Sequence, residues 1–219
     1  EGLENMSYLG FSTKWAASLA KMHHLDEKKQ TELTYAIEVV TLNSINVFMT
    51  LALGWALGVC GGTAAALLAV AGFRHTAGGG HSESPWRCAL VTITIFPLLA
   101  LAARSVSTWP PYYISLLSLG AILFGFACIF LYAPADNPKA PIVSPVKRQK
   151  LKRAAILIMS IISIITIALL FGSRGNTPMI CMCLVLSTLW ASFNLTPWGH
   201  HLWHFIDKIG SSSERRCMK

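Results

Sequence analysis

Five long stretches without a charged side chain constrain the fold of this chain more than any other feature. They hold 35, 16, 31, 20 and 32 residues, at 39–73, 88–103, 105–135, 154–173 and 175–206. A helix needs about 20 mainly apolar residues to cross the hydrocarbon core of a bilayer, and a helix satisfies its own backbone hydrogen bonds there. The sequence therefore predicts an all-α, polytopic membrane protein.

The composition excludes several other classes of protein. Hydrophobic residues make up 53% of the chain and charged residues only 13%, about half the charged share of an ordinary soluble domain. These values argue against a soluble enzyme, a disordered regulator and a disulfide-stapled secreted module. The net charge of +8 indicates membrane orientation and attraction to anionic lipid or an acidic peptide. We find no nucleic-acid-binding pattern and expect no nucleic-acid partner.

The distribution of basic residues predicts the topology. We expect spans near 36–58, 88–105, 111–133, 153–172 and 178–197. The short apolar segment 61–73 is either a sixth crossing or a re-entrant arm. With six crossings, all Lys and Arg residues except Arg104 and Arg174 fall on one face. Because cytoplasmic loops carry an excess of Lys and Arg, we expect six spans with both termini in the cytoplasm.

The same reasoning divides the chain into three regions. Residues 1–34 form an N-terminal cytoplasmic segment, in which the apolar spacing over 3–25 predicts a basic amphipathic helix on the cytoplasmic leaflet. Residues 35–197 form the six-span membrane domain, and residues 198–219 form a cytoplasmic tail. The membrane domain contains two cytoplasmic loops of interest, at 74–88 and at 134–153, the second of which is basic.

The loop 74–88 is the candidate functional segment. It packs two His, one Glu, two Arg, one Cys and three successive Gly between hydrophobic segments. Ionisable residues at the membrane edge point to function. Ser84-Pro85 predicts a helix start, which places Cys88 in the first helical turn. The positive end of that helix and the neighbouring Arg87 both favour a thiolate.

A cysteine–histidine dyad is one interpretation of this loop. The glycine run before His81 and the helix break at Pro85 let His81 fold back towards Cys88, as a general base must. Ser82 or Glu83 then orients the imidazole, and the amides of the glycine run, including Gly79 and Gly80, form an oxyanion site.

Other interpretations of the histidines stay open. His75, His81 and Cys88 offer three ligands for a metal, although their spacing is not a usual zinc pattern. A surface or packing role for His75 is also open. A second histidine group near the C-terminus, His200, His201 and His204, fits an interfacial anchor. We expect no metal and no cofactor.

Two motifs resemble a known family. The run 74–81 with Cys88 seven residues after His81, followed by a proline-rich loop at 132–142, is similar to the accessory gene regulator B (AgrB-like) family of bacterial membrane cysteine peptidases. The size and the six-span plan also agree. This chain departs from the family pattern by a third glycine, Gly80, and by a long N-terminal segment.

The resemblance implies a reaction and a partner. Cys88 would be the nucleophile and His81 its base, cleaving a small AgrD-like quorum-sensing propeptide at its C-terminal side in the bacterial plasma membrane. The thioester acyl-enzyme would then close to a thiolactone or lactone ring. Arg74 and Arg87 would bind the substrate, and the basic loop would hold the acidic tail of the propeptide through Lys147, Arg148, Lys150, Lys152 and Arg153. For the basic stretch 147–153, a topology anchor is the alternative.

Two further functions compete with an enzyme. A small-peptide transporter or exporter without proteolytic activity would use the 74–88 loop as a gate, and a scaffold would use it only as a structured connection. The spans 88–103 and 154–173 contain no charge, which argues against a transport path lined by ionisable groups. The sequence leaves the oligomeric state open, a homodimer being one alternative.

Overall fold

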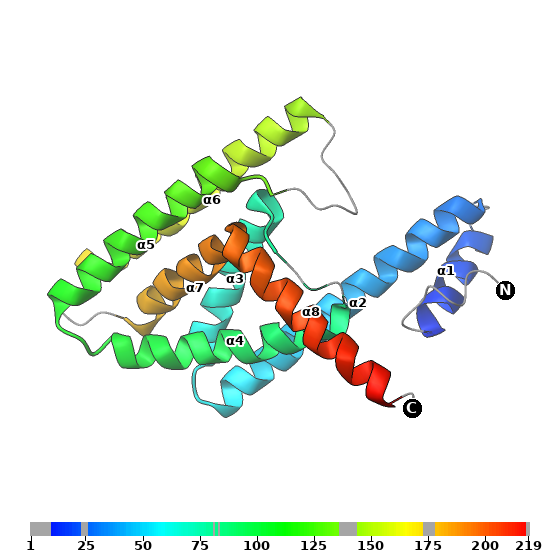
Figure 1. The fold of residues 1–219 in the computed structure, drawn as a ribbon, viewed down its shortest axis with the longest axis horizontal. Helices are drawn as coiled ribbons and strands as arrows, with labels where there is room; N and C mark the ends of the chain where they lie inside the picture. Colours follow the sequence, from blue (N-terminus) through cyan, green and yellow to red (C-terminus); the bar gives the residue numbers. More distant parts are fainter. Residues whose placement is uncertain are drawn as a thin grey trace. The chain divides into compact units, whose positions relative to one another are not determined.

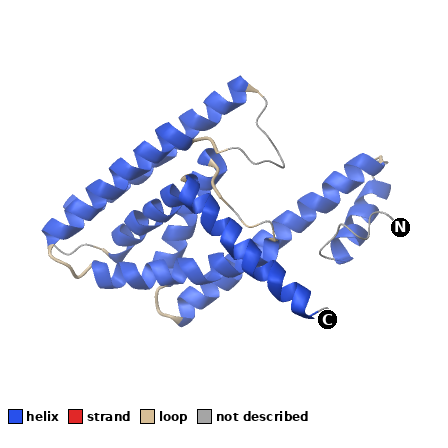
Figure 2. Cartoon of the chain, in the orientation of Figure 1, coloured by secondary structure: helices blue, strands red, loops and turns tan. Residues whose placement is uncertain are grey.

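A computed structural model describes residues 10–22, 26–80, 82, 84–135, 144–172 and 178–217. These residues form helices and turns, without a strand among them (Figure 2). The helices are α1 (Gly10–Met22), α2 (Glu27–Ala56), α3 (Cys60–Ala77), α4 (Pro85–Val106), α5 (Pro111–Tyr132), α6 (Pro145–Gly172), α7 (Met179–Leu195) and α8 (Pro197–Cys217). The predicted all-α class is confirmed.

Several of these helices have the length and composition of membrane spans. Within the described ranges, α2, α4, α5 and α6 qualify individually, and α7 qualifies together with the first part of α8, from which it is bent by 82°. Helix α3, which contains the short segment 61–73, runs for 18 residues. Four or five candidate spans make a multi-pass protein, and the count of six crossings stays a prediction.

The first of two compact units covers residues 1–49 and contains α1 and most of α2. Small side chains of α1, Ala16 and Ala20, are buried, while Trp15 and Met22 are exposed. The Ser12 hydroxyl donates a hydrogen bond of 2.9 Å to the buried carboxylate of Glu38. The amphipathic helix predicted over 3–25 is thus present at 10–22, and the rest of that range lies outside the described residues.

The second unit begins at Thr50 and is organised around α7. This helix packs against α3, α4, α5 and α6, and eleven of its 17 residues are buried (Figure 1). Small residues permit the close approach of its neighbours: a Cβ on Gly125 of α5 would lie 3.3 Å from the Ser192 hydroxyl of α7. Helices in lipid associate through such small-residue contacts, because the surrounding tails are as apolar as the side chains.

A sharp break between α7 and α8 sends the C-terminal helix across the bundle (Figure 1). Pro197 starts α8, and the Asn194 side chain bridges the break: its amide donates to the Trp190 carbonyl at 2.7 Å, and its oxygen accepts from the Trp203 indole at 2.6 Å. Trp203 is buried, with 4% of its surface exposed. These contacts fix the first turns of α8 against the end of α7.

The backbone after α3 adopts a conformation that requires glycine, in the glycine run 78–80. Gly78 and Gly79 have φ of +80° and +129°, which other residues rarely adopt. A Cβ on Gly78 would also lie 2.8 Å from the Ala135 carbonyl oxygen, and the Ala135 amide donates to the Ala77 carbonyl at 2.8 Å. The glycine run therefore lies directly against the chain that leaves α5.

Gly80, the glycine by which this chain departs from the family pattern, is constrained by contact. Its amide donates to the Asn194 carbonyl at 2.9 Å, and a Cβ at this position would lie 2.6 Å from Cδ1 of Trp203. A contact under 3.0 Å forces a shift of the buried indole. Gly80 is thus the point where the α3–α4 connection closes onto the α7–α8 break.

Helix α6 begins earlier than the sequence pattern indicated. Residues 145–153, which we expected within the basic loop 134–153, form the first turns of α6. The Arg148 amide donates to the Ser144 carbonyl at 3.1 Å. Residues 136–143 of that loop lie outside the described residues. The basic side chains of 147–153 are therefore carried by a helix.

Replacing Gly80 by Ala should destabilise the second unit, because the added methyl group displaces the Trp203 indole from its contact with Asn194. Overpacking of this kind costs about 1–3 kcal/mol, which lowers the unfolding midpoint by about 3–10 °C. Tryptophan fluorescence during heating in lipid nanodiscs would measure the midpoint. Gly120→Ala is the matched control, because a Cβ at Gly120 meets nothing within 4 Å. Equal midpoints for the two variants would contradict this account of Gly80.

Candidate active site

Cys88 lies in the first turn of α4. Ser84 is extended, Pro85 is the first helical residue, and the Cys88 amide donates to the Ser84 carbonyl at 3.1 Å. The predicted helix start is thus confirmed, but the Ser84 hydroxyl forms no capping hydrogen bond. Cys88 is half-buried and is a free cysteine. The thiol therefore lies at the positive end of a helix, where an anionic sulfur is stabilised.

Arg74, near the end of α3, lies beside this thiol. Its Nη2 is 4.0 Å from Sγ of Cys88. Arg74 thus places a positive charge next to the sulfur of Cys88. Sequence reasoning placed Arg74 among the substrate-binding residues and missed this contact with Cys88.

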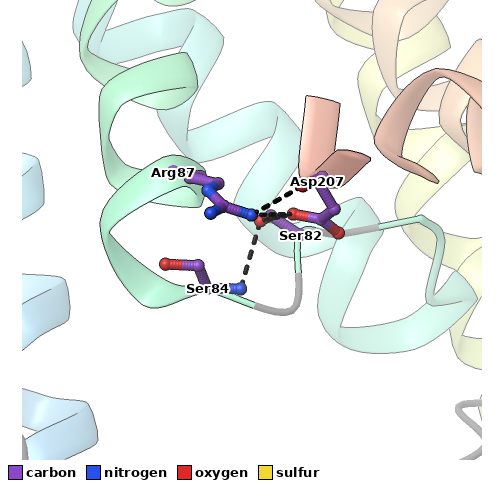
Figure 3. Close-up of polar contacts among 4 residues, drawn as sticks. All are labelled: Ser82, Ser84, Arg87 and Asp207. Carbon is purple, nitrogen blue, oxygen red and sulfur yellow. Dashed lines mark hydrogen bonds and ion pairs between the residues drawn. The ribbon is translucent and has the colours of Figure 1, made fainter. Parts of the chain in front are cut away.

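Arg87 is paired within the protein (Figure 3). Its Nη1 lies 3.6 Å from Oδ1 of Asp207 in α8, and the same nitrogen donates to the Asp207 carbonyl at 2.9 Å. The Ser82 hydroxyl donates to Oδ1 of Asp207 and accepts from the Ser84 amide at 3.2 Å. Asp207 therefore joins the α3–α4 connection to α8.

Asp207 was not among the sequence-predicted site residues. The one signal in the sequence was its place as the first charged residue after the 32-residue uncharged stretch. Ser82 donates its hydroxyl proton to Asp207, and the role expected for Ser82 in orienting His81 stays a prediction. Arg87, expected to bind substrate, has its charge directed to the same carboxylate.

The oxyanion role predicted for Gly80 is corrected by the structure. Its amide N–H already donates to the Asn194 carbonyl at 2.9 Å, so it is not available to a developing oxyanion. Gly79 stays a prediction. His81 and Glu83 lie outside the described residues, so the dyad and its orientation also stay predictions.

A mainly apolar pocket opens beside the glycine run. The pocket is small, with a volume of about 30 Å³. Arg74 lines the pocket as well as contacting Cys88, so the pocket adjoins the thiol. The remaining lining residues come from α3, the glycine run, α4, α7 and α8: Val70, Phe73, Gly78, Gly79, Gly80, Val91, Thr92, Ile95, Phe96, Trp190, Ala191, Asn194 and Trp203.

In the part of the chain that the structure describes, the C-terminal histidine group makes no hydrogen bond with Cys88. Nδ1 of His200 lies 3.0 Å from the Thr196 carbonyl of its own helix region, and His201 and His204 are exposed on α8. Across the described ranges, no group of three or more His, Cys, Asp or Glu side chains is arranged to hold a metal ion.

The basic residues of α6 differ in their environments. Lys152 donates to the Phe130 carbonyl in the last turn of α5 at 2.9 Å, which satisfies a helix-terminal carbonyl. Lys147, Arg148, Lys150 and Arg153 are exposed. Cations at a helix N-terminus oppose the helix dipole, so this end of α6 is favourable for an added anion.

Comparisons with known proteins agree on one family. The model of the family described as accessory gene regulator B matches residues 12–195. An AgrB-like protein of Clostridium perfringens (strain SM101 / Type A) is 25% identical over 215 residues, covering 94% of this chain and 97% of the relative. The accessory gene regulator protein B of Staphylococcus carnosus (strain TM300) is 28% identical over 152 residues, covering 69% and 76%. No solved structure matches the chain.

The family match contains the thiol and its cationic neighbour. Arg74, the glycine run and Cys88 all fall within residues 12–195, whereas Trp203 and Asp207 follow that range. The matched range covers most of the 219 residues, and this chain therefore belongs to the accessory gene regulator B family.

Proposed function

We propose that this chain is a membrane cysteine endopeptidase that cleaves a small quorum-sensing propeptide at its C-terminal side and releases it as a ring. The observation that carries the proposal is the position of Cys88, at the start of α4 with the Arg74 guanidinium 4.0 Å from its sulfur. Both features place positive charge beside the side chain proposed as the nucleophile.

The first half of the reaction forms a thioester. The thiolate of Cys88 attacks a backbone carbonyl carbon of the propeptide, and a carbon–sulfur bond forms. His81, the proposed base, takes the thiol proton and then gives it to the departing amine as the carbon–nitrogen bond breaks. The acidic C-terminal segment leaves, and the remaining peptide is held on Cys88 as an acyl group.

The second half closes the ring. A cysteine or serine side chain of the bound peptide attacks the thioester carbonyl, and the bond to Cys88 breaks. The attacking group gives its proton to the Cys88–His81 pair. Because the thioester keeps the acyl group activated, ring closure consumes no nucleotide. Water would hydrolyse the same thioester, so the reaction needs a site that excludes water, which a half-buried thiol among apolar helices favours.

The start of α6 is the proposed binding surface for the acidic segment of the propeptide. Four exposed cationic side chains lie near a helix N-terminus, and both these charges and the helix dipole there favour carboxylates. Lys152 contributes by fixing α6 to the end of α5. Anionic lipid headgroups are the other ligand for such a surface. The two ligands predict a different dependence of KM on the acidic segment and on the lipid content.

Replacing Cys88 or His81 by Ala should abolish cleavage, because each removes one member of the nucleophile–base pair. The expected loss is at least about 1000-fold, as for other nucleophile–base pairs. Mass spectrometry of a candidate propeptide, encoded beside this protein, after incubation with protein in lipid would detect the shortened product and the Cys88 adduct. Cys60→Ala is the matched control, because Cys60 is also a half-buried free cysteine in the first turn of a helix.

Each outcome of that experiment has a distinct meaning. Cleavage that persists in Cys88→Ala would overturn the enzyme proposal. An intact propeptide with wild-type protein, together with Cys88 labelling by a thiol-reactive probe that depends on His81, would point to a wrong substrate. Loss of that labelling as well would favour a transport function.

Replacing Lys147, Arg148 and Lys150 together by Glu should raise KM for the propeptide about tenfold. Each exposed ion pair with the acidic segment contributes a fraction of a kcal/mol to about 1 kcal/mol, and the variant loses three of them. The effect should shrink as salt screens the charges. Initial cleavage rates at several salt concentrations would measure both. Arg104→Glu, at the exposed end of α4, is the control with unchanged KM. A KM that follows the anionic lipid content and ignores the acidic segment would assign the surface to lipid.

A further inference from the structure

We propose that Asp207 of α8 is a positioning residue for the nucleophile, an inference that rests on the function proposed above. Its carboxylate contacts both sides of the α4 start (Figure 3). Ser82 precedes the helix and follows His81 directly in the chain, and Arg87 directly precedes Cys88. One side chain therefore restrains the neighbours of both proposed catalytic residues.

The contacts of Arg87 are suited to holding a fixed geometry. Its Nη1 meets Asp207 at two places, the carboxylate oxygen at 3.6 Å and the backbone carbonyl at 2.9 Å. The side chains of Arg87 and Asp207 are 21% and 16% exposed, so solvent screens this pair less than a pair on the open surface. Hydrogen bonds to charged groups are also stronger than neutral ones.

Ser82 completes the connection on the other side. Its hydroxyl donates to Asp207 and accepts from the Ser84 amide, so the turn that starts α4 is bonded through Ser82 to α8. An aliphatic residue at 207 would remove the Ser82 link and the side-chain part of the Arg87 contact, and it would leave the bond from Arg87 to the backbone carbonyl at 207. The helix would persist, because its start at Pro85 is local, but its first turn would lose two side-chain restraints.

This arrangement separates the roles of two arginines. Arg87 directs its charge to Asp207, whereas Arg74 lies against the Cys88 sulfur. Loss of the carboxylate would remove this anionic partner of Arg87 within the same turn as Cys88. We therefore expect the position of the thiol, and the reactivity that depends on it, to change when Asp207 is replaced.

The test compares Asp207→Asn, Asp207→Ala and Asp207→Glu with wild type in lipid nanodiscs. Three quantities are measured: kcat and KM for the propeptide, the rate of Cys88 alkylation by iodoacetamide across a range of pH, and the unfolding midpoint. His204→Gln is the control, because His204 is an exposed side chain on the same helix, one turn away.

A positioning role predicts a specific pattern. Asp207→Asn should lower kcat about tenfold or more and change KM less than about twofold, because a positioning residue acts on the nucleophile and not on substrate binding. The alkylation rate of Cys88 should change with it, at an unfolding midpoint close to that of wild type. Asp207→Glu should recover part of kcat. In the double variant Arg87→Met with Asp207→Asn the two losses should not add in full, since both variants weaken the contact between the Arg87 and Asp207 side chains.

Other results overturn the inference. Wild-type kcat and alkylation in Asp207→Asn would do so, as would a raised KM with unchanged kcat, which would make Asp207 part of substrate binding. A loss of activity that only follows the unfolded fraction would make its role purely structural. If wild-type protein itself shows neither cleavage nor His81-dependent labelling of Cys88, the proposed function fails, and that result is distinct from these.

Discussion

The structure around the thiol depends on the hydrogen bonds of one residue, Asn194. Its carbonyl accepts the Gly80 amide, its side-chain oxygen accepts the Trp203 indole, and its side-chain amide satisfies the Trp190 carbonyl. Helices in hydrocarbon satisfy their own backbones, but the two breaks that meet here cannot do so. Asn194 supplies partners to both breaks at once. The irregular connection that carries Ser82 and Ser84 is therefore held by the bundle, although it belongs to neither helix that it joins.

Local sequence signals predicted the elements well where a single physical rule governs them. Uncharged stretches gave the apolar helices, and Ser84-Pro85 placed the start of α4 at Pro85 because proline is tolerated in the first turn and not beyond it. The expected spans placed the starts of α2 and α6 too late in the chain, and both errors have one reason. Both helices continue past the hydrocarbon into charged residues, to Glu27 and Pro145, and hydrophobicity reports where a span ends and not where a helix ends.

The candidate site was predictable only as far as it is local. Cys88 in a first turn follows from neighbouring residues, whereas its contact with Arg74 joins residues 14 apart and the Arg87–Asp207 contact joins residues 120 apart. The error at Gly80 has the same origin: a glycine-rich run appears in sequence as a source of free amides, and the partner that occupies this amide lies on α7. The sequence alone contains no signal for which distant carbonyl or carboxylate will meet the loop.

The family match and the physical unit around the thiol end at different places. The match stops at Leu195. Asn194 lies inside the matched range, and Trp203, which donates its indole N–H to Asn194, lies beyond it. A chain trimmed at that border would keep the whole matched range and would lose the buried indole beside Gly80 and the carboxylate beside Arg87. The contacts that hold the surroundings of the thiol therefore extend past the range of the family match, into the C-terminal helix.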